Sequence, residues 1–246
     1  MTITVVIPTL NEEAVLPRTL SLTAGLGFDE LIVVDGGSHD RTREIVTALR
    51  VTRDASPVDP NLPPVTRHAS PVTLLTAPPG RARQMNAGGT SSKGDVLLFL
   101  HADTSLPSDA RQAVERALED PACVGGRFDM RFERDSGLGW LISRMMNLRS
   151  RWTGIATGDQ AIFVRRSVFD QLGGYSDLPI MEDVDFTRRL KRIGLIAALQ
   201  SKVTTSYRRW DTRGPLRTIL LMWTLRFLYW IGISPHSLTR LYGSVR

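Results

Sequence analysis

A histidine and an aspartate stand directly after an apolar run near the middle of the chain. Residues 96–100 are all apolar, and His101, Ala102 and Asp103 follow at once. Such a run predicts a strand buried on both faces, and in open α/β sheets ligands bind at the carboxyl ends of the strands. Alternation along an extended chain places His101 and Asp103 on one side. With its hard carboxylate oxygen, Asp103 is the first candidate ligand of a metal–diphosphate site, and His101 is the second.

Two earlier segments end in the same way. The β-branched run 3–7 stops at Pro8, and the run 31–34 stops at Asp35. Polar residues follow each run, and a helical pattern follows them, with Asn11 as the expected cap of the first helix. Strands that alternate with helices in this order are typical of a parallel, doubly wound sheet. We therefore expect an α/β fold of Rossmann-like type.

The second half of the chain follows a different pattern. Residues 124–132 alternate strictly, with Phe128 and Met130 on one side and Arg127 and Asp129 on the other. This alternation predicts a half-buried strand, of the kind found in antiparallel sheets. We therefore expect a mostly parallel sheet that becomes mixed in its second half.

Three regions follow from these patterns. Residues 1–210 form the expected α/β domain, and a proline-containing near-repeat at 51–71 is expected to be an inserted flexible loop. Residues 211–246 form an apolar helical tail. Its segment 215–233 combines Trp, Tyr and Leu with Arg217 and Arg226, which suits a helix lying at a membrane surface rather than crossing it. Packing against the core or against a second subunit of a homo-oligomer remains the alternative.

Composition limits the partners. The chain of 246 residues has 42% hydrophobic content, a net charge of +6, and only one cysteine, so an internal disulfide is excluded. The positive charge suits nucleoside diphosphates or anionic lipid headgroups, whereas no nucleic-acid motif is present. The first residues lack a charged leader and already look like a strand. We expect a cytoplasmic protein, peripheral to the inner face of the membrane.

Taken together, five motifs in this order resemble the family 2 glycosyltransferases of the GT-A fold, over residues 3–210. The motifs are Val6–Glu12, Val34–Thr42, Gly80–Ala82 with Asn86–Gly88, His101–Asp103, and Glu182–Asp183. The blocks 80–86, 101–104 and 158–164 are most similar to a bacterial subgroup associated with radical-SAM enzymes and arsenosugar biosynthesis.

The resemblance implies an inverting transfer of a hexose from a UDP- or GDP-linked sugar to an acceptor hydroxyl, with Mn²⁺ or Mg²⁺. Asp103 matches the second acid of the family's Asp-x-Asp motif, whereas His101 replaces the first. Asp35 would accept hydrogen bonds from the nucleobase, and Arg81 would lie near the base or the phosphates. The other implied donor-binding residues are Pro8, Leu10, Glu12 and Ala102.

For the acceptor side, Asp183 matches the family's general base, and Glu182 competes for that role. The implied acceptor-binding residues are Gly158, Asp159, Gln160, Arg209 and Trp210. The last two belong to a partial match to the Gln-x-x-Arg-Trp motif of processive members, but Ser206 stands in place of its glutamine, so processivity is not supported.

Two other functions are alternatives to this one. A sugar-1-phosphate nucleotidyltransferase usually carries a glycine-rich basic signature soon after the first strand, which residues 8–13 lack. A non-catalytic, membrane-peripheral protein that binds nucleotide sugars would tolerate Asp183→Asn, whereas an enzyme would lose turnover and still bind the donor nucleotide. The simpler roles are a strand-end turn for Asp35 and a helix-start acid for Asp183.

Overall fold

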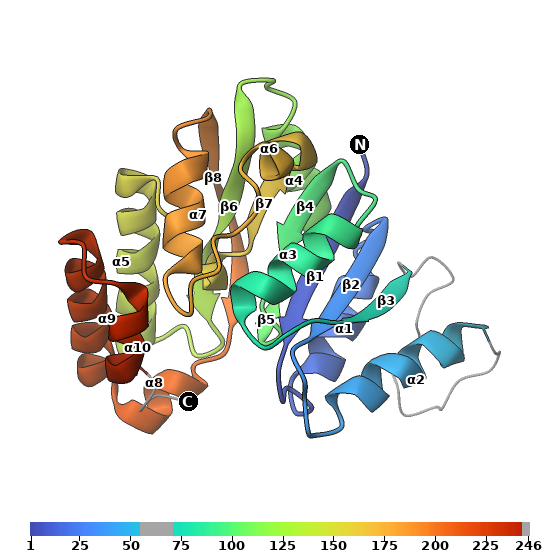
Figure 1. Cartoon of the computed structure of the whole chain (residues 1–246), viewed down its shortest axis with the longest axis horizontal. Helices are drawn as coiled ribbons and strands as arrows, with labels where there is room; N and C mark the ends of the chain where they lie inside the picture. The colour runs from blue at the N-terminus through green and yellow to red at the C-terminus, as the bar shows by residue number, and fades with distance from the viewer. Residues whose placement is uncertain (55–70, 243–246) are drawn as a thin grey trace.

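The computed structural model describes residues 1–54 and 71–242, built around one eight-stranded sheet (Figure 1). The strands lie in the order β3-β2-β1-β4-β7-β6-β8-β5. Their bounds are β1 (Ile3–Thr9), β2 (Glu30–Asp35), β3 (Val72–Thr76), β4 (Val96–Phe99), β5 (Thr104–Ser105), β6 (Cys123–Phe132), β7 (Ile162–Arg165) and β8 (Leu195–Thr205).

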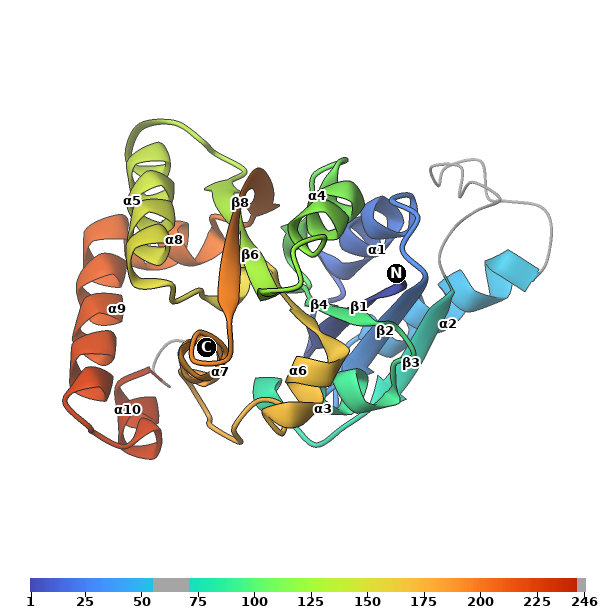
Figure 2. The ribbon, with the colours of Figure 1, turned by 90° about the horizontal axis from the view of Figure 1, so that it is seen from above.

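Helices cover both faces of the sheet, as the view from above shows (Figure 2). One apolar cluster joins the sheet to α1 (Leu16–Ala24), α2 (Thr42–Asp54), α4 (Ala110–Ala117) and α5 (Gly137–Thr153). A second cluster, on the other face, joins it to α3 (Arg81–Ser91), α6 (Arg166–Gln171) and α7 (Glu182–Leu190). A 3₁₀ turn, η1 (Gly158–Gln160), precedes β7.

The sheet is parallel in its first half and mixed in its second, as expected. β3, β2, β1 and β4 pair in parallel, whereas β7 is antiparallel to both of its neighbours, β4 and β6. β6 is in turn parallel to β8. β7 is therefore the strand that changes direction. The alternating strand β6 was expected to be antiparallel, and it is antiparallel to β7 but parallel to β8.

The alternating pattern of β6 was misleading about burial. Arg127 and Asp129 were expected on an exposed face, but their exposed fractions are 2% and 8%. α5 covers that face, and its Arg151 lies 2.7 Å from Asp129, which also pairs with Arg127. The side chain of Asn147 exchanges two 2.9 Å hydrogen bonds with the backbone of Met130. Buried charges persist here because each is paired.

Asn11 does not cap the first helix. α1 begins five residues later, at Leu16, and Asn11 instead has a positive φ of 55° in the loop. Its Oδ1 accepts the His39 N–H at 2.9 Å, and its own N–H donates to Ser38 Oγ at 2.9 Å. Asparagine tolerates this left-handed conformation better than most residues. Its role is therefore to tie the loop after β1 to the loop after β2.

The C-terminal segment forms α8 (Arg208–Arg213), α9 (Pro215–Trp230) and α10 (Pro235–Tyr242). α9 lies beside α5 in both views (Figures 1 and 2). Leu225 of α9 and Leu238 of α10 pack in one cluster with Ile180 and Met181, just before α7. In the described residues, no helix has the length and apolar character needed to cross a membrane.

The expected loop at 51–71 begins later than predicted, because α2 continues to Asp54. The rest of that predicted insertion, residues 55–70, lies outside the described residues.

We predict that Asp129→Ala lowers the free energy of unfolding by about 3–5 kcal/mol, because it leaves the buried guanidinium of Arg127 without its carboxylate. Urea denaturation would measure the change. Glu133→Ala is the matched control on the same strand end, since its pair with Arg18 is exposed and should contribute less than about 1 kcal/mol. Equal losses in the two variants would contradict the prediction.

Candidate active site

Loops after β1, β2 and β4 meet at the carboxyl edge of the parallel strands. The Glu12 N–H donates to Thr42 Oγ1 at 2.9 Å, which joins the first two loops. Asp35 ends β2 with its side chain fully buried. Its carboxylate accepts the N–H groups of Gly37 and Ser38 at 3.1 Å and the Ser38 hydroxyl at 2.5 Å. In this structure Asp35 therefore fixes its own loop.

The start of α3 is locked against the ends of β1 and β2. Gln84 Nε2 donates to the backbone oxygens of Thr9 at 2.6 Å and Val34 at 2.9 Å. A Cβ on Gly88 would come within 2.3 Å of Val6, so only glycine permits this approach of α3 to β1. The sequence analysis did not single out Gln84. Its contacts with the ends of β1 and β2 are visible only in the folded chain. They fix α3, which begins at Arg81.

His101 and Asp103 do not lie on an extended strand. β4 ends at Phe99, and the Thr104 N–H donates to the His101 backbone oxygen at 3.1 Å, so the chain turns between them. The alternation argument for a shared side is therefore wrong. The His101 ring packs against Gly158, where an added Cβ would lie 2.3 Å from Nε2. His101 therefore packs against the η1 turn, whereas the charge of Asp103 acts on the loop after β1.

The charge of Asp103 acts on a second acid, Glu12, in the loop after β1. Burial, followed by the charge of Asp103, raises the pKa of Glu12 above its ordinary value, while Arg208 opposes the rise. Glu12 Oε2 is enclosed without a hydrogen bond and lies 3.6 Å from Arg208 Nη2. Two neighbouring carboxylates suit a Mg²⁺ or Mn²⁺ ion that takes its remaining ligands from water and substrate phosphates. The described residues contain no group of three or more His, Cys, Asp or Glu arranged for a metal.

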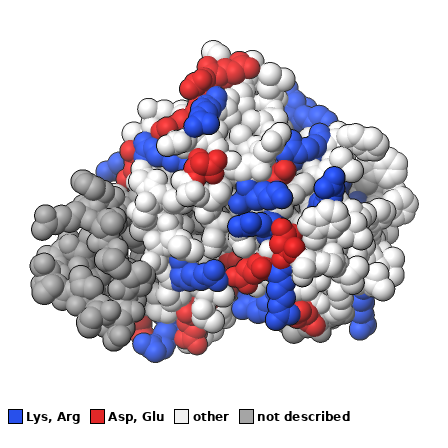
Figure 3. Space-filling model, turned by 180° about the vertical axis from the view of Figure 1, so that it is seen from behind, with Lys and Arg blue, Asp and Glu red and all other residues white. Residues whose placement is uncertain are grey.

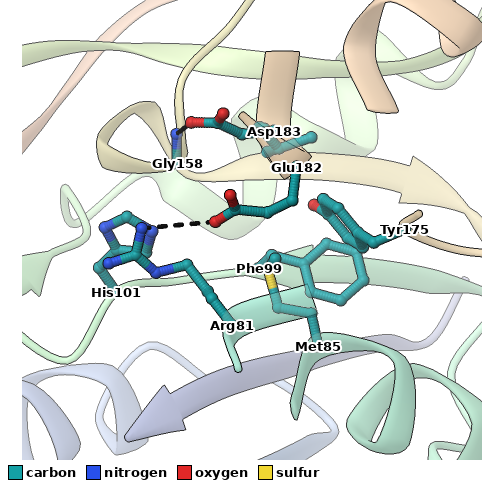
Figure 4. Close-up of a pocket in the computed structure, with 9 residues that line it drawn as sticks. Arg81, Met85, Phe99, His101, Gly158, Tyr175, Glu182 and Asp183 are labelled. Atoms are coloured by element: carbon teal, nitrogen blue, oxygen red, sulfur yellow. Dashed lines mark hydrogen bonds and ion pairs between the residues drawn. The ribbon is translucent and has the colours of Figure 1, made fainter. Parts of the chain in front are cut away.

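A small enclosed pocket lies between the start of α3, the end of β4 and the start of α7 (Figure 4). Arg81 and Glu182 meet there, with 3.4 Å between Arg81 Nη1 and Glu182 Oε1. Burial and the neighbouring charge of Asp183 raise the pKa of Glu182, while Arg81 opposes the rise. The remaining lining residues are Met85, Phe99, His101, Gly158, Ile162, Tyr175 and Asp183.

Asp183 is fixed by backbone donors. Its Oδ2 accepts the Gly158 N–H at 2.8 Å and its Oδ1 accepts the Val184 N–H at 2.7 Å. Figure 4 shows this carboxylate turned toward Gly158, while Glu182 is turned toward Arg81. The two consecutive acids therefore serve different neighbours. A carboxylate held by two N–H groups still has lone pairs free to accept a proton.

The η1 turn owes its position to α5. Gln160 closes a capping box with Thr157 and donates from Nε2 to Ser150 Oγ at 3.1 Å. Asp159 accepts the Thr157 hydroxyl at 2.5 Å. Burial, with Asp183 as a smaller cause, raises the pKa of Asp159. Of the three predicted acceptor residues of this turn, Gly158 contacts Asp183 and Asp159 interacts with its charge, whereas Gln160 is turned to α5.

Tyr175 is a pocket residue that the sequence analysis did not identify. Its ring stacks on Phe186 at 4.1 Å, and its hydroxyl is buried without a hydrogen-bond partner. Asn86 holds it through two 2.8 Å hydrogen bonds with the Tyr175 backbone. A tyrosine after two glycines gives no pattern that points to a site. Asn86, which holds Tyr175, belongs to a motif of the family resemblance, and that motif is the sequence signal for this region.

Four other predicted residues, Pro8, Leu10, Ala102 and Trp210, are not among those that line the pocket. Pro8 is buried in β1, Leu10 is half-buried after it, and Ala102 is buried, with its backbone oxygen accepting from Thr19 at 2.6 Å. Trp210 packs at 5.6 Å from Phe132, as part of the core, and does not line the pocket. The side chain of Arg209 lies outside the described part of the structure.

Comparison with known proteins gives one family. The model of the family described as "Glycosyl transferase family 2" matches residues 4–173. An undecaprenyl-phosphate 4-deoxy-4-formamido-L-arabinose transferase of Pseudomonas paraeruginosa is 34% identical over 171 residues, which make up 66% of this chain and 46% of that protein. The chain therefore spans about half the length of this relative.

Two solved structures share the fold at low identity. A mannosyltransferase from Pyrobaculum calidifontis, in complex with GDP-Man and Mn²⁺, has a TM-score of 0.64 and 18% identity, covering 91% of this chain and 64% of that one. TarS of S. aureus, residues 1–349 with UDP-GlcNAc, has a TM-score of 0.61 and 17% identity, covering 84% of this chain and 58% of that one. The expected mixed α/β sheet of GT-A type is confirmed.

We predict that Glu182→Gln changes how stability depends on pH. The raised pKa of Glu182 means that the folded state binds a proton more readily than the unfolded state. Its favourable contribution is complete below the unfolded pKa of about 4.3 and is lost as pH rises through the higher folded pKa. Thermal melts from pH 4 to 8 should therefore show the variant gaining stability relative to the unsubstituted protein as pH rises. A difference that stays constant with pH would contradict the prediction.

Proposed function

The chain belongs to glycosyl transferase family 2, and on that premise we propose that this enzyme transfers a hexose from a nucleoside diphosphate sugar to an acceptor hydroxyl, with inversion. The observation that carries the proposal is the position of Asp183. It lies at the start of α7, held by the Gly158 N–H, and lines one pocket with Arg81 and His101. An acid from α7, an arginine from α3 and a histidine that follows β4 thus converge at the carboxyl edge of the sheet, where ligands bind in such folds.

The donor is proposed to occupy the loops after β1, β2 and β4. GDP-Man and UDP-GlcNAc, which are bound in the two related structures, support a UDP- or GDP-linked sugar. Asp35 lies at the end of β2, where a nucleobase would meet the loop that it fixes. Pro8 at the end of β1 and Leu10 and Glu12 in the loop after it would line the donor site beside Asp35. Arg81 is placed to meet the diphosphate, since a guanidinium suits phosphate oxygens.

Asp103, with Glu12 beside it, is proposed to hold the divalent cation. A bound Mn²⁺ or Mg²⁺ would stabilise the negative charge that develops on the departing diphosphate. The burial of Glu12 and the charge of Asp103, which together raise the pKa of Glu12, support this assignment, because a bound cation would offset both effects. His101 remains a predicted ligand, although its ring packs on Gly158, on the side of Asp183.

Asp183 is proposed as the general base that takes the proton of the acceptor hydroxyl. Glu182 is less suited to this role, because Arg81 pairs with it and burial favours its protonated form. Gly158 holds the Asp183 carboxylate, and Asp159 and Gln160 shape the space beside it. In an inverting transfer the base lies on the side opposite the leaving group, which suits an acid on α7 facing a donor on β1 and β4.

Membership in family 2 favours this reaction over a sugar-1-phosphate nucleotidyltransferase and over a non-catalytic binding protein. The narrower assignment, to the subgroup associated with radical-SAM enzymes and arsenosugar biosynthesis, depends on the blocks 80–86, 101–104 and 158–164 alone and stays a prediction. The domain limits 1–210 and 211–246, and a homo-oligomer, likewise stay predictions.

A membrane surface with anionic lipids is proposed to meet the face formed by α5 and α9. Each helix exposes large apolar side chains at alternating spacings of three and four residues. On α5 these are Leu138, Leu141, Met145, Leu148 and Trp152, and on α9 they are Leu216, Leu220, Trp223, Phe227 and Trp230. So many exposed apolar groups are unusual on a monomer surface.

The charges of this face favour lipid over a second subunit. α5, α9 and α10 contain no acidic residue, whereas Arg144 and Arg217 are exposed on α5 and α9. In Figure 3 the right-hand end of the molecule, where these helices lie, is largely uncharged. Tryptophans beside arginines suit a helix that rests in a headgroup layer. The predicted peripheral location at the inner membrane face would follow.

The donor site would be tested by thermal shift with UDP- and GDP-sugars, with and without Mn²⁺. We expect one donor to stabilise the protein more with Mn²⁺, because the metal ion links the diphosphate to Asp103. Asp103→Ala should lose that metal-dependent gain. Asp135→Ala, at an exposed aspartate, should keep it. If no donor gives a metal-dependent shift, the proposed donor site is wrong.

Asp183→Asn should lower kcat by about 10²–10⁴ fold, because the amide cannot take a proton, while donor binding stays unchanged. Nucleotide release from the stabilising donor, with water as acceptor, would be the measurement. Asp185→Asn is the control, since this acid lies on the same helix and pairs with Arg189 at 2.8 Å. Full turnover in Asp183→Asn would refute the role of the base.

For the membrane face, flotation with vesicles should show binding to anionic phosphatidylglycerol but weak binding to neutral phosphatidylcholine, because the arginines need anionic headgroups. Trp223→Glu combined with Trp230→Glu should abolish binding, since charge in the apolar stripe opposes burial. Leu22→Glu, at an exposed leucine of α1, should leave it intact. A stable dimer without vesicle binding would assign the face to a second copy.

A further inference from the structure

Four elements converge around Asp183, and two of them contribute arginines that the proposed reaction has not used. α5 holds the η1 turn through Ser150 and Gln160, and that turn holds Asp183 through the Gly158 N–H. Arg149 is the neighbour of Ser150 on α5. On the other side, Leu225 of α9 packs with Ile180 and Met181, directly before Glu182 and Asp183. Arg226 follows Leu225 on α9, and Asp183 and Asp159 act on its charge.

Arg149 lacks hydrogen-bond partners for part of its guanidinium. Its Nε and Nη2 are enclosed and make no hydrogen bond, although the residue as a whole is only half-buried. Enclosed donors of a charged group are costly to leave unsatisfied. Native structures keep such a group mainly where a ligand, water or ion completes it. The Nε and Nη2 donors of Arg149 could therefore bind a ligand that accepts hydrogen bonds.

The two arginines also affect each other. Burial, followed by the charge of Arg226, lowers the pKa of Arg149 to about 10, and Asp159 and Asp183 oppose that change. Burial likewise lowers the pKa of Arg226, and the same two acids oppose it. Like charges that approach in a partly buried place repel each other, and an anion between them would remove that cost. Asp159 offers limited compensation, because burial raises its own pKa.

We propose that Arg149 and Arg226 form a subsite for a phosphate group carried by the acceptor, next to the Asp183 carboxylate. The inference rests on the proposed function, since it takes Asp183 as the base on the acceptor side. Two guanidiniums can bind one phosphate through several charge-assisted hydrogen bonds. Such a group would hold the acceptor while its hydroxyl meets Asp183. α9 then serves two purposes, because Arg226 completes the subsite while the apolar stripe of the same helix faces outward.

The subsite lies apart from the groups that would bind the donor phosphates. Arg81 is paired with Glu182, on the side of the pocket turned away from the Asp183 carboxylate (Figure 4). A donor diphosphate near Arg81 and Asp103 and an acceptor phosphate near Arg149 would therefore flank Asp183 from two directions. The acceptor class that this arrangement selects is a phosphorylated alcohol, and neutral sugars would lack the second anchor.

The test uses methyl phosphate as the probe on the full chain, once without nucleotide and once with UDP or GDP and Mn²⁺ at saturating concentration. Thermal shift at constant ionic strength should show stabilisation by methyl phosphate and little by acetate. Arg149→Gln and Arg226→Gln should each weaken the apparent affinity at least about tenfold, the cost of one charge-assisted contact. Arg149→Lys, which keeps the charge but loses the planar fork, should fall between them and the unsubstituted protein.

Matched controls are Arg144→Gln on α5 and Arg217→Gln on α9, because both arginines are exposed on the same two helices. These variants should respond to methyl phosphate as the unsubstituted protein does. Equal stabilisation by acetate, or equal losses in the control variants, would overturn the proposal. A response that disappears once UDP or GDP is bound would assign the arginines to the donor phosphates and also overturn it. Binding of UDP or GDP is measured separately. If neither nucleotide binds while the response to methyl phosphate persists, the proposed function fails and the phosphate subsite does not.

Discussion

The hydrogen bond from the Gly158 N–H to Asp183 connects the parts of this protein that matter for its chemistry. The acid belongs to the first turn of α7, and the donor belongs to the η1 turn, which α5 holds in place through Gln160. His101 can lie against Gly158 only because glycine has no Cβ, since a Cβ there would collide with the His101 ring. One backbone contact thus sets the position of the acid relative to the end of β4.

The parallel half of the sheet supplies the other side of the site. Loops after β1 and β2 are joined by Asn11 and Thr42, and Gln84 bridges the two strand ends from α3. The hydrogen bonds of Gln84 are buried and that of Thr42 is partly buried, so loss of either partner would leave a polar group unsatisfied, whereas the bond of Asn11 is exposed. The edge of the sheet is therefore a rigid frame. Such a frame suits recognition of a nucleotide, whose base and phosphates must be held at fixed separations.

The mixed half of the sheet carries the acceptor side and the outward-facing helices. β7 reverses direction between β4 and β6, and η1 leads into it, beside the end of β4. α5 buries the Arg127–Asp129 pair on one side and presents an apolar stripe on the other. α9 packs beside it and also contacts the residues before α7. A surface that meets a membrane and a site that meets a phosphate can therefore share two helices.

Local sequence indicated the strands at 3–7, 31–34, 96–100 and 124–132 and the acids Asp35 and Asp103 that follow two of them, because apolar runs that end at polar residues indicate buried strands. It gave no sign of β8, and Asp183 was indicated only by the resemblance to family 2. Tertiary structure alone decided which of these residues meet. The charge of Asp103 acts on Glu12 and His101 packs against Gly158, since a turn after β4 replaces the extended chain that alternation assumes. Arg127 and Asp129 are buried because α5 covers them, a contact between segments that no local period encodes. Tyr175, Gln84 and Arg149 owe their places to long-range packing, and their neighbours in the chain give no sign of it.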